Sequence, residues 1–373
     1  MGQFKIPPVS TLLGSTLTNF FRVLKKGHIS PKYYHKITFT LLIILIATPF
    51  HWWEELSFRR KLRRFRFDKP PLFILGHWRS GTTLLHNMLC LDPRAGYVTT
   101  YQSILPNNLA SKWLFKTFMK MKIPSHRPSD NMPLGPDMPQ EEELAFANCQ
   151  PYAFYVFFYF PSKYKVLYDK SVYHKGLTLK EKDTWYRLYD KLLKKALINT
   201  GGERLIVKNP VNTARIRHIL KMYPDARFLY IYRNPVSVFL STRLFLQHLL
   251  PAVTLEKYSN EAIEEIVYVT YNRLLNDYFE QKDLIPAGHL LEIRYEDFIA
   301  NPVDTLDNVY HDLLHEDFSD VKERFHTYRE SLESYIKNKY VIDRTTIEKI
   351  RERLGKFLEY YHYDIPEEVE IRK

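Results

Sequence analysis

The sequence has only two cysteines, Cys90 and Cys149, among its 373 residues, and it has no Asn-x-Ser/Thr glycosylation site. Two cysteines cannot form the disulfide framework of a small secreted protein, and a glycosylated surface loop would need an acceptor asparagine. We therefore expect a cytoplasmic protein that keeps both thiols reduced.

Acidic residues are scarce at the start of the chain. Residues 1–70 contain 13 Lys and Arg but only 3 Asp and Glu, so they carry 10 of the 12 net positive charges. A nucleic-acid-binding body would need basic residues spread along the surface that meets the nucleic acid. Because residues 71–373 are nearly balanced in charge, we expect no nucleic-acid partner.

Charged residues are absent from residues 37–53, and the segment FRRKLRRFRF then brings six basic residues between Arg59 and Arg66. A membrane-spanning helix needs about 20 apolar residues, and this shorter run also contains Pro49. A tryptophan pair next to basic residues is typical of a helix lying on an anionic membrane surface. We predict that residues 37–66 contact the inner face of the membrane; a helix packed on the protein itself or on a homodimer partner, and a true span, are the alternatives.

Short apolar runs alternate with longer helical patterns after residue 70. The runs at 72–75, 205–207, 228–232 and 290–293 predict buried parallel strands, and residues 83–91, 178–199, 213–222, 235–249 and 255–281 predict helices. This order predicts a P-loop-like α/β fold with three layers, in which helices flank a central parallel sheet. We expect a domain at 70–373 with a lid-like insertion around 96–165, preceded by a separate hydrophobic and basic segment at 1–69.

The segment LFILGHWRSGTTLLHNML at 72–89 predicts a strand, a turn and a helix. A turn of this kind points backbone N–H groups at an anion. In this segment the N–H groups are those of Ser80, Gly81, Thr82 and Thr83. Gly76 and Gly81 have the spacing of a Walker A loop, but Thr82 stands where that loop has lysine. Arg79 supplies a cation instead. We therefore favour an anionic donor handled without a metal over a P-loop kinase or another phosphoryl-transfer enzyme.

Two later strands also end in cations. The strand at 205–207 is followed by Lys208, and the strand at 228–232 by Arg233. If a helix begins near Pro235, Arg233 and Ser241 can reach one phosphate together.

These segments resemble the sulfotransferases that use 3′-phosphoadenosine 5′-phosphosulfate (PAPS), especially the bacterial-type branch. The resemblance covers about residues 70–365 and is carried by GHWRSGTTLLHN, PQEEE, VKNP, YPDARFLYIYRNP and YEDF. It implies that residues 79–83 hold the phosphosulfate, that Arg233 and Ser241 hold the 3′-phosphate, and that Tyr295 lies against the adenine. Asn338 and Lys339 occupy the region that completes the 3′-phosphate site in the family. The product nucleotide would be adenosine 3′,5′-bisphosphate.

Sulfuryl transfer to a hydroxyl requires a cation at the leaving oxygen and a base for the acceptor proton. Lys208 has the position of the family lysine that stabilises the leaving group, but Pro210 stands where some branches have the catalytic histidine. The resemblance favours Glu141 or Glu143 as the base. His77 and His86 remain alternatives, and so does a purely helix-capping role for the glutamates.

The acceptor is less well defined by the sequence. Seven aromatic residues between Tyr152 and Phe160 suit either an apolar acceptor pocket or the protein core. Together with the hydrophobic first segment, they favour a small lipophilic alcohol such as a sterol, a lipid or a phenol. A non-catalytic membrane-bound scaffold that retains a nucleotide fold is the remaining alternative.

Overall fold

The computed structural model describes residues 8–123, 133–331 and 340–372. They form two compact units, each assembled from separate parts of the chain. The first unit contains the chain up to Pro71, Arg94–Asn209 and Leu246–Ile263; the second contains Leu72–Pro93, Pro210–Phe245 and the chain from Glu264 onward. This division differs from the predicted one, because the 1–69 segment and the 96–165 region belong to the same unit.

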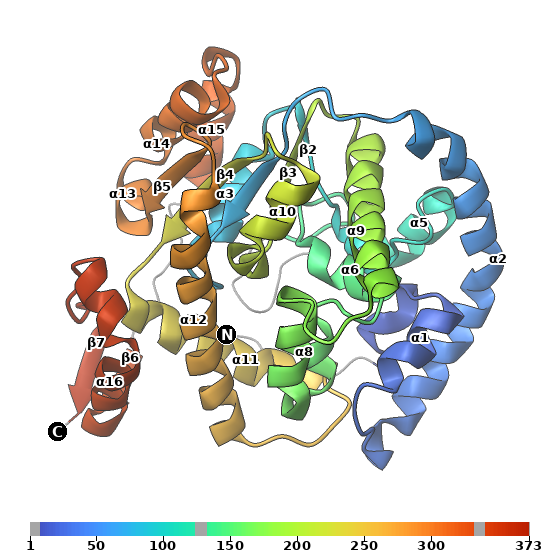
Figure 1. Ribbon diagram of the computed structural model, residues 1–373, viewed down its shortest axis with the longest axis horizontal. Coiled ribbons are helices and arrows are strands. Elements are labelled where there is room, and N and C mark those ends of the chain that lie inside the picture. Colours follow the sequence, from blue (N-terminus) through green and yellow to red (C-terminus); the bar gives the residue numbers. More distant parts are fainter. Residues whose placement is uncertain (1–7, 124–132, 332–339, 373) are drawn as a thin grey trace. The chain divides into compact units, whose positions relative to one another are not determined.

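The first unit is mostly helical (Figure 1). Its elements are η1 (Thr11–Gly14), α1 (Leu17–Leu24), η2 (Pro31–Tyr33), α2 (Tyr34–Arg64), β2 (Ala95–Gly96), α4 (Thr100–Ile104), α5 (Lys112–Lys122), α6 (Glu142–Cys149), α7 (Val156–Tyr159), η3 (Pro161–Lys163), α8 (Tyr164–Val172), α9 (Leu179–Thr200) and β3 (Arg204–Lys208).

The second unit carries most of the strands. Its elements are β1 (Leu72–Leu75), α3 (Thr82–Leu89), η4 (Pro210–Ala214), α10 (Ile216–Met222), β4 (Arg227–Tyr232), η5 (Lys282–Leu284), β5 (Leu290–Arg294), α13 (Tyr295–Ala300), α14 (Pro302–Asn308), the π-helical η6 (Val309–Leu314), α15 (Ser319–Ser331), β6 (Tyr340–Asp343), α16 (Arg344–Tyr360) and β7 (Val369–Arg372). Two helices, α11 (Pro235–Val253) and α12 (Asn260–Gln281), have residues in both units.

The strand pairings confirm the predicted α/β class with a parallel sheet flanked by helices. In the second unit β4 pairs in parallel with β1 on one side and with β5 on the other, so that Leu72 lies opposite Arg227 and Phe228 opposite Leu290. In the first unit β2 pairs in parallel with β3. The parallel pair of β6 and β7 was not predicted.

The predicted elements are present, with shifted boundaries. Helix α12 begins at Asn260 rather than at residue 255, because the Ser259 side chain caps it by accepting a hydrogen bond from the Ala262 N–H at 3.2 Å. The predicted helix at 213–222 begins instead with the 3₁₀ turn η4. In β5 only Ile293 is buried, so the predicted burial of residues 290–293 is wrong for this strand.

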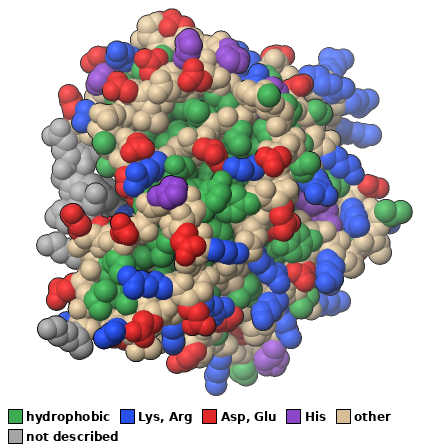
Figure 2. All heavy atoms as spheres, turned by 60° about the vertical axis from the view of Figure 1, so that its left-hand side comes forward, with side chains coloured by type: hydrophobic (Ala, Val, Ile, Leu, Met, Phe, Trp, Pro, Cys, Tyr) green, Lys and Arg blue, Asp and Glu red, His purple; other side chains and the backbone are tan. Residues whose placement is uncertain are grey.

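Aromatic side chains fill the core of each unit. In the first unit Trp185 stacks on Tyr189 with ring centroids 5.1 Å apart, and Phe146 meets both rings edge-on. In the second unit Tyr230 of β4 stacks on Tyr278 of α12 at 3.8 Å. On the face drawn in Figure 2, acidic and basic side chains are mixed over most of the surface, with Lys and Arg gathered toward one edge.

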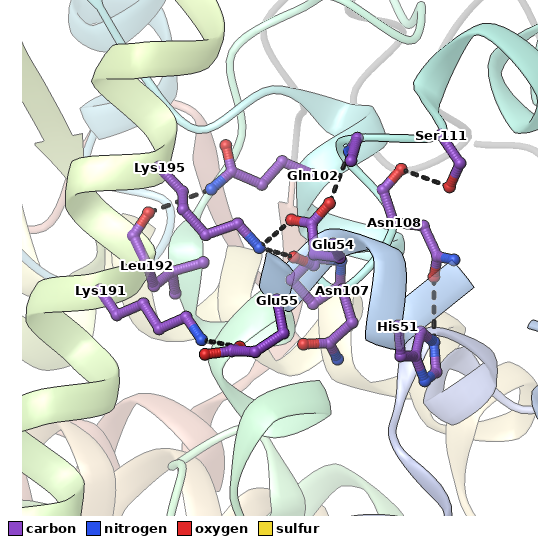
Figure 3. A network of polar contacts seen from close by, with 12 residues as sticks. His51, Glu54, Glu55, Gln102, Asn107, Asn108, Ser111, Lys191, Leu192 and Lys195 are labelled. Carbon is purple, nitrogen blue, oxygen red and sulfur yellow. Dashed lines mark hydrogen bonds and ion pairs between the residues drawn. The ribbon is translucent and has the colours of Figure 1, made fainter. Parts of the chain in front are cut away.

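A buried ion pair attaches α2 to the rest of the first unit (Figure 3). Glu54 of α2 pairs with Lys195 of α9, and only 5% of either side chain is exposed. Lys195 also donates to the Pro106 carbonyl at 2.5 Å, and the Ala110 N–H donates to Glu54 at 2.5 Å. These partners replace the water that both charges lose on burial.

We predict that Glu54→Gln destabilises the protein by roughly 3–5 kcal/mol, because it leaves the Lys195 ammonium buried without a counter-charge. The free energy of unfolding in urea measures this cost. Glu348→Gln is the matched control: it removes an acid from the exposed pair with Arg344, and should cost about 0–1 kcal/mol. Equal losses for the two variants would contradict the structural role of the Glu54 pair.

Candidate active site

The predicted phosphate loop lies in the second unit between β1 and α3. Gly76 has φ +135°, and a Cβ at this position would lie 2.4 Å from the Ile231 carbonyl oxygen of β4. The Gly76 N–H donates to the Thr213 hydroxyl at 2.8 Å. The loop is therefore pressed closely against the neighbouring strand, as only glycine permits.

The end of the loop has an unusual backbone conformation. Arg79 has φ +69°, and Gly81, which precedes α3 at its N-cap, has φ +94°. A Cβ on Gly81 would lie 2.4 Å from the ring of Tyr295. The loop thus leads into the first turn of α3, where backbone N–H groups point away from the helix. Anions bind readily at such a place.

Four of the predicted nucleotide residues meet beside this loop. Arg79 Nε donates to Ser241 Oγ of α11 at 2.8 Å, and Arg233 donates to the Arg79 carbonyl at 3.2 Å. The Arg233 guanidinium lies over the Tyr295 ring, 4.4 Å from its centroid. The second unit therefore brings two cations, a hydroxyl and an aromatic ring to the phosphate loop.

A carboxylate from the end of the chain joins this group. Ser237 donates to Glu368 at 2.9 Å, and an Arg233 nitrogen lies 3.8 Å from the same carboxylate oxygen. Sequence reasoning missed Glu368, because nothing in its PEEVE surroundings indicates a partner for residues of α11. The predicted Asn338 and Lys339 lie outside the described residues.

The two candidate histidines are buried. His77 is 2% exposed, its Nδ1–H donates to the Trp78 carbonyl at 2.9 Å, and burial lowers its pKa to about 4. His77 is therefore neutral at neutral pH. His86 is 1% exposed, inside α3. Burial of both rings favours a packing role over proton transfer to a substrate.

The predicted catalytic residues lie in the first unit. Lys208 ends β3, and its Nζ lies 2.6 Å from Oε1 of Glu141, the residue at the N-cap of α6. The Lys208 side chain is 2% exposed, whereas that of Glu141 is 31% exposed. The structure thus pairs a buried cation with an accessible carboxylate.

The two following glutamates have different surroundings. Glu143 is buried and accepts hydrogen bonds from the Phe154 N–H and, at 2.6 Å, from the Asn209 amide. Glu142 accepts from Tyr189 at 2.7 Å and from the same amide at 2.9 Å, and burial together with the Glu143 charge raises its pKa. Both side chains hold α6 in the core, and of these three glutamates only Glu141 is exposed to solvent.

The aromatic run at 152–160 belongs mainly to the core of the first unit. Phe154, Phe157 and Phe158 are at most 5% exposed. Tyr155 is only half-buried; burial raises its pKa to about 12, and the charge of Glu141 contributes to that rise. Its phenol is therefore within electrostatic reach of the accessible carboxylate.

Comparison with known proteins gives consistent results. The model described as "Sulfotransferase family" matches residues 70–320. The omega-hydroxy-beta-dihydromenaquinone-9 sulfotransferase Stf3 of Mycobacterium bovis is 29% identical over 326 residues, which are 86% of this chain and 82% of the relative.

Solved structures share the fold. The sulfotransferase STF1 from Mycobacterium tuberculosis has a TM-score of 0.66 at 17% identity, covering 92% of this chain and 94% of the other. The sulfotransferase STF9 from Mycobacterium avium has the same TM-score at 13% identity, covering 96% and 98%.

The crowding of Gly81 by Tyr295 gives a test of the loop. A Cβ at positive φ costs about 1–2 kcal/mol, and Gly81→Ala should cost more because it also displaces the Tyr295 ring. Gly288→Ala is the matched control, since Gly288 has φ +75° with nothing within 4 Å of the added Cβ. We expect thermal unfolding to show a larger loss for Gly81→Ala. A loss no larger than that of Gly288→Ala would disprove the tight packing of the loop on Tyr295.

Proposed function

Because the chain belongs to the sulfotransferase family, we propose that it transfers a sulfuryl group from PAPS to the hydroxyl of a small lipophilic acceptor. The observation that carries this proposal is the ion pair between Lys208 and Glu141. It unites the two charges that sulfuryl transfer requires, a cation for the leaving oxygen and a base for the acceptor proton.

The second unit has the groups to hold the nucleotide. The donor is a polyanion, and Arg79 and Arg233 supply cations beside a loop whose backbone leads into a helix N-terminus. Residues 79–83 would bind the phosphosulfate, Arg233 and Ser241 the 3′-phosphate, and Tyr295 the adenine. In the structure Arg233 lies beside the Glu368 carboxylate. The 3′-phosphate would take the place of this carboxylate beside Arg233. The residues present therefore fit PAPS.

The first unit has the groups for the transfer itself. PAPS supplies the sulfuryl group at its phosphosulfate bond. Glu141 would accept the proton of the acceptor hydroxyl while the hydroxyl oxygen bonds to sulfur, and Lys208 would neutralise the phosphate oxygen that leaves the sulfur. The products are a sulfate ester and adenosine 3′,5′-bisphosphate.

Two observations support a lipophilic acceptor. The half-buried aromatic Tyr155 lies within electrostatic reach of Glu141. The relative Stf3 is named for a reaction on a hydroxylated dihydromenaquinone, a lipophilic alcohol. We place the reaction in the cytoplasm, since Cys90 and Cys149 are both free thiols.

We predict that Glu141→Gln lowers kcat for sulfuryl transfer about 100- to 10,000-fold, because it removes the general base. Transfer from PAPS to a pool of lipophilic alcohols measures the effect, and titration with adenosine 3′,5′-bisphosphate checks that the nucleotide still binds. Glu143→Gln is the matched control: its amide oxygen can still accept from Asn209, although the hydrogen bond from the Phe154 N–H is lost. Circular dichroism checks that this variant is folded, and turnover of the folded protein should persist. Loss of turnover in Glu143→Gln with normal turnover in Glu141→Gln would reverse the assignment.

Metal dependence separates this proposal from a P-loop kinase. We expect adenosine 3′,5′-bisphosphate to bind equally well in EDTA and in Mg²⁺, because Arg79 and Arg233 supply the positive charge that a kinase obtains partly from the metal. Isothermal titration under both conditions measures this. A requirement for Mg²⁺, or preferential binding of ATP, would favour phosphoryl transfer; absence of nucleotide binding would favour a non-catalytic scaffold.

A further inference from the structure

Helix α2 is apolar where it meets solvent and mixed where it meets the first unit. Its inward face buries three polar residues, Lys36, Thr40 and Glu54, along with Ile44, Ala47 and Phe58. The opposite face exposes seven large apolar side chains, each between 49% and 75% accessible: Phe39, Leu42, Leu45, Ile46, Trp52, Trp53 and Leu56. A helix that only covers its own domain has the reverse pattern. An exposed apolar stripe of this length indicates a binding surface.

Helix α5 adds a second exposed stripe beside the first. Phe115 of α5 meets Phe50 of α2 edge-on with ring centroids 5.1 Å apart, and Met119 packs in one cluster with Phe58. Away from this contact α5 exposes apolar side chains from 42% to 76%: Trp113, Leu114, Phe118 and Met121. We call these eleven exposed side chains of α2 and α5 the apolar platform.

The charges around the platform are mostly positive. The end of α2 and the residues after it expose six cations with no acid among them: Arg59, Arg60, Lys61, Arg63, Arg64 and Arg66. Two nearby acids already have lysine partners, Glu55 with Lys191 and Asp137 with Lys116. The platform therefore combines an apolar surface with an adjoining cationic one, which suits an anionic lipid bilayer.

Polar contacts hold α2 along the surface of the first unit. The Lys36 ammonium donates to the Ala252 carbonyl at 2.5 Å, and the Ser10 N–H donates to the Thr40 hydroxyl at 2.8 Å. Further along, Glu54 forms the buried pair with Lys195. By length and composition α2 could cross a membrane, but a span would break all of these contacts. A helix fixed along its whole length instead presents one face to a membrane.

We propose that the apolar platform docks the protein on the surface of an anionic phospholipid bilayer, with the tryptophan rings at the headgroup level and the cations 59–66 against lipid phosphates. A second copy of the chain is the alternative occupant. A second copy would bring its own cations 59–66 to the interface. Glu54, Glu55 and Asp137 would not balance these cations, because each of the three acids is already paired with a lysine of its own copy. Charge therefore favours lipid, and docking does not depend on the proposed transfer reaction.

Vesicle co-sedimentation of the full chain tests the proposal. We expect binding to vesicles of phosphatidylcholine mixed with phosphatidylglycerol and weak binding to phosphatidylcholine alone. The double variant Trp52→Glu, Trp113→Glu should weaken binding roughly tenfold or more. The matched control combines Leu179→Glu with Val166→Glu, which places the same two charges on side chains of the first unit that are 80% and 54% exposed but outside the platform; it should bind normally.

Three results would overturn the proposal. The first is that the protein without substitutions binds neither kind of vesicle. The second is that this protein and the double variant bind vesicles equally well. The third is a dimer in solution, seen by light scattering, that the double variant separates into monomers, because the platform would then be a self-association surface. Circular dichroism of the double variant shows whether it remains folded.

Discussion

The ion pair of Lys208 and Glu141 is the interaction on which the proposed chemistry depends. A lysine that is 2% exposed needs a counter-charge, and the carboxylate that supplies it is the accessible one of three consecutive glutamates. Strand β3 positions the lysine, and the N-cap of α6 positions the carboxylate. Glu142 and Glu143 hold that helix in place through the Asn209 amide. The residues around the pair therefore determine which of the three glutamates is exposed.

In the proposed reaction the second unit meets a different requirement, which is to bring the polyanionic donor close to the backbone of the loop. Gly76 and Gly81 let the loop approach β4 and Tyr295 more closely than any side chain would allow. Arg79 and Arg233 are then held beside the loop by contacts with each other and with Ser241. The backbone conformation of the loop therefore sets the positions of the two cations beside it.

The sequence predicted these features to different degrees. Four strands and the loop at 76–83 could be predicted, because parallel strands are often short apolar runs and the loop has a characteristic glycine spacing, although β5 proved to be mostly unburied. Which of Glu141 and Glu143 is exposed could not be predicted, since it depends on contacts of Asn209 and Phe154 that are distant in sequence. Glu368 and the α5 stripe were missed for the same reason. The aromatic run at 152–160 was compatible with either the protein core or an acceptor pocket, and most of the run lies in the core.

The most direct measurement of the central claim is a mass-spectrometric screen of lipid, steroid and phenol pools incubated with PAPS and the purified protein. We expect at least one alcohol to gain the mass of one SO₃ group, and we expect this gain to disappear with Lys208→Ala although adenosine 3′,5′-bisphosphate still binds. A gain that persists in Lys208→Ala would contradict the role of the ion pair. No gain in any pool, together with no binding of the nucleotide, would contradict the proposed function itself.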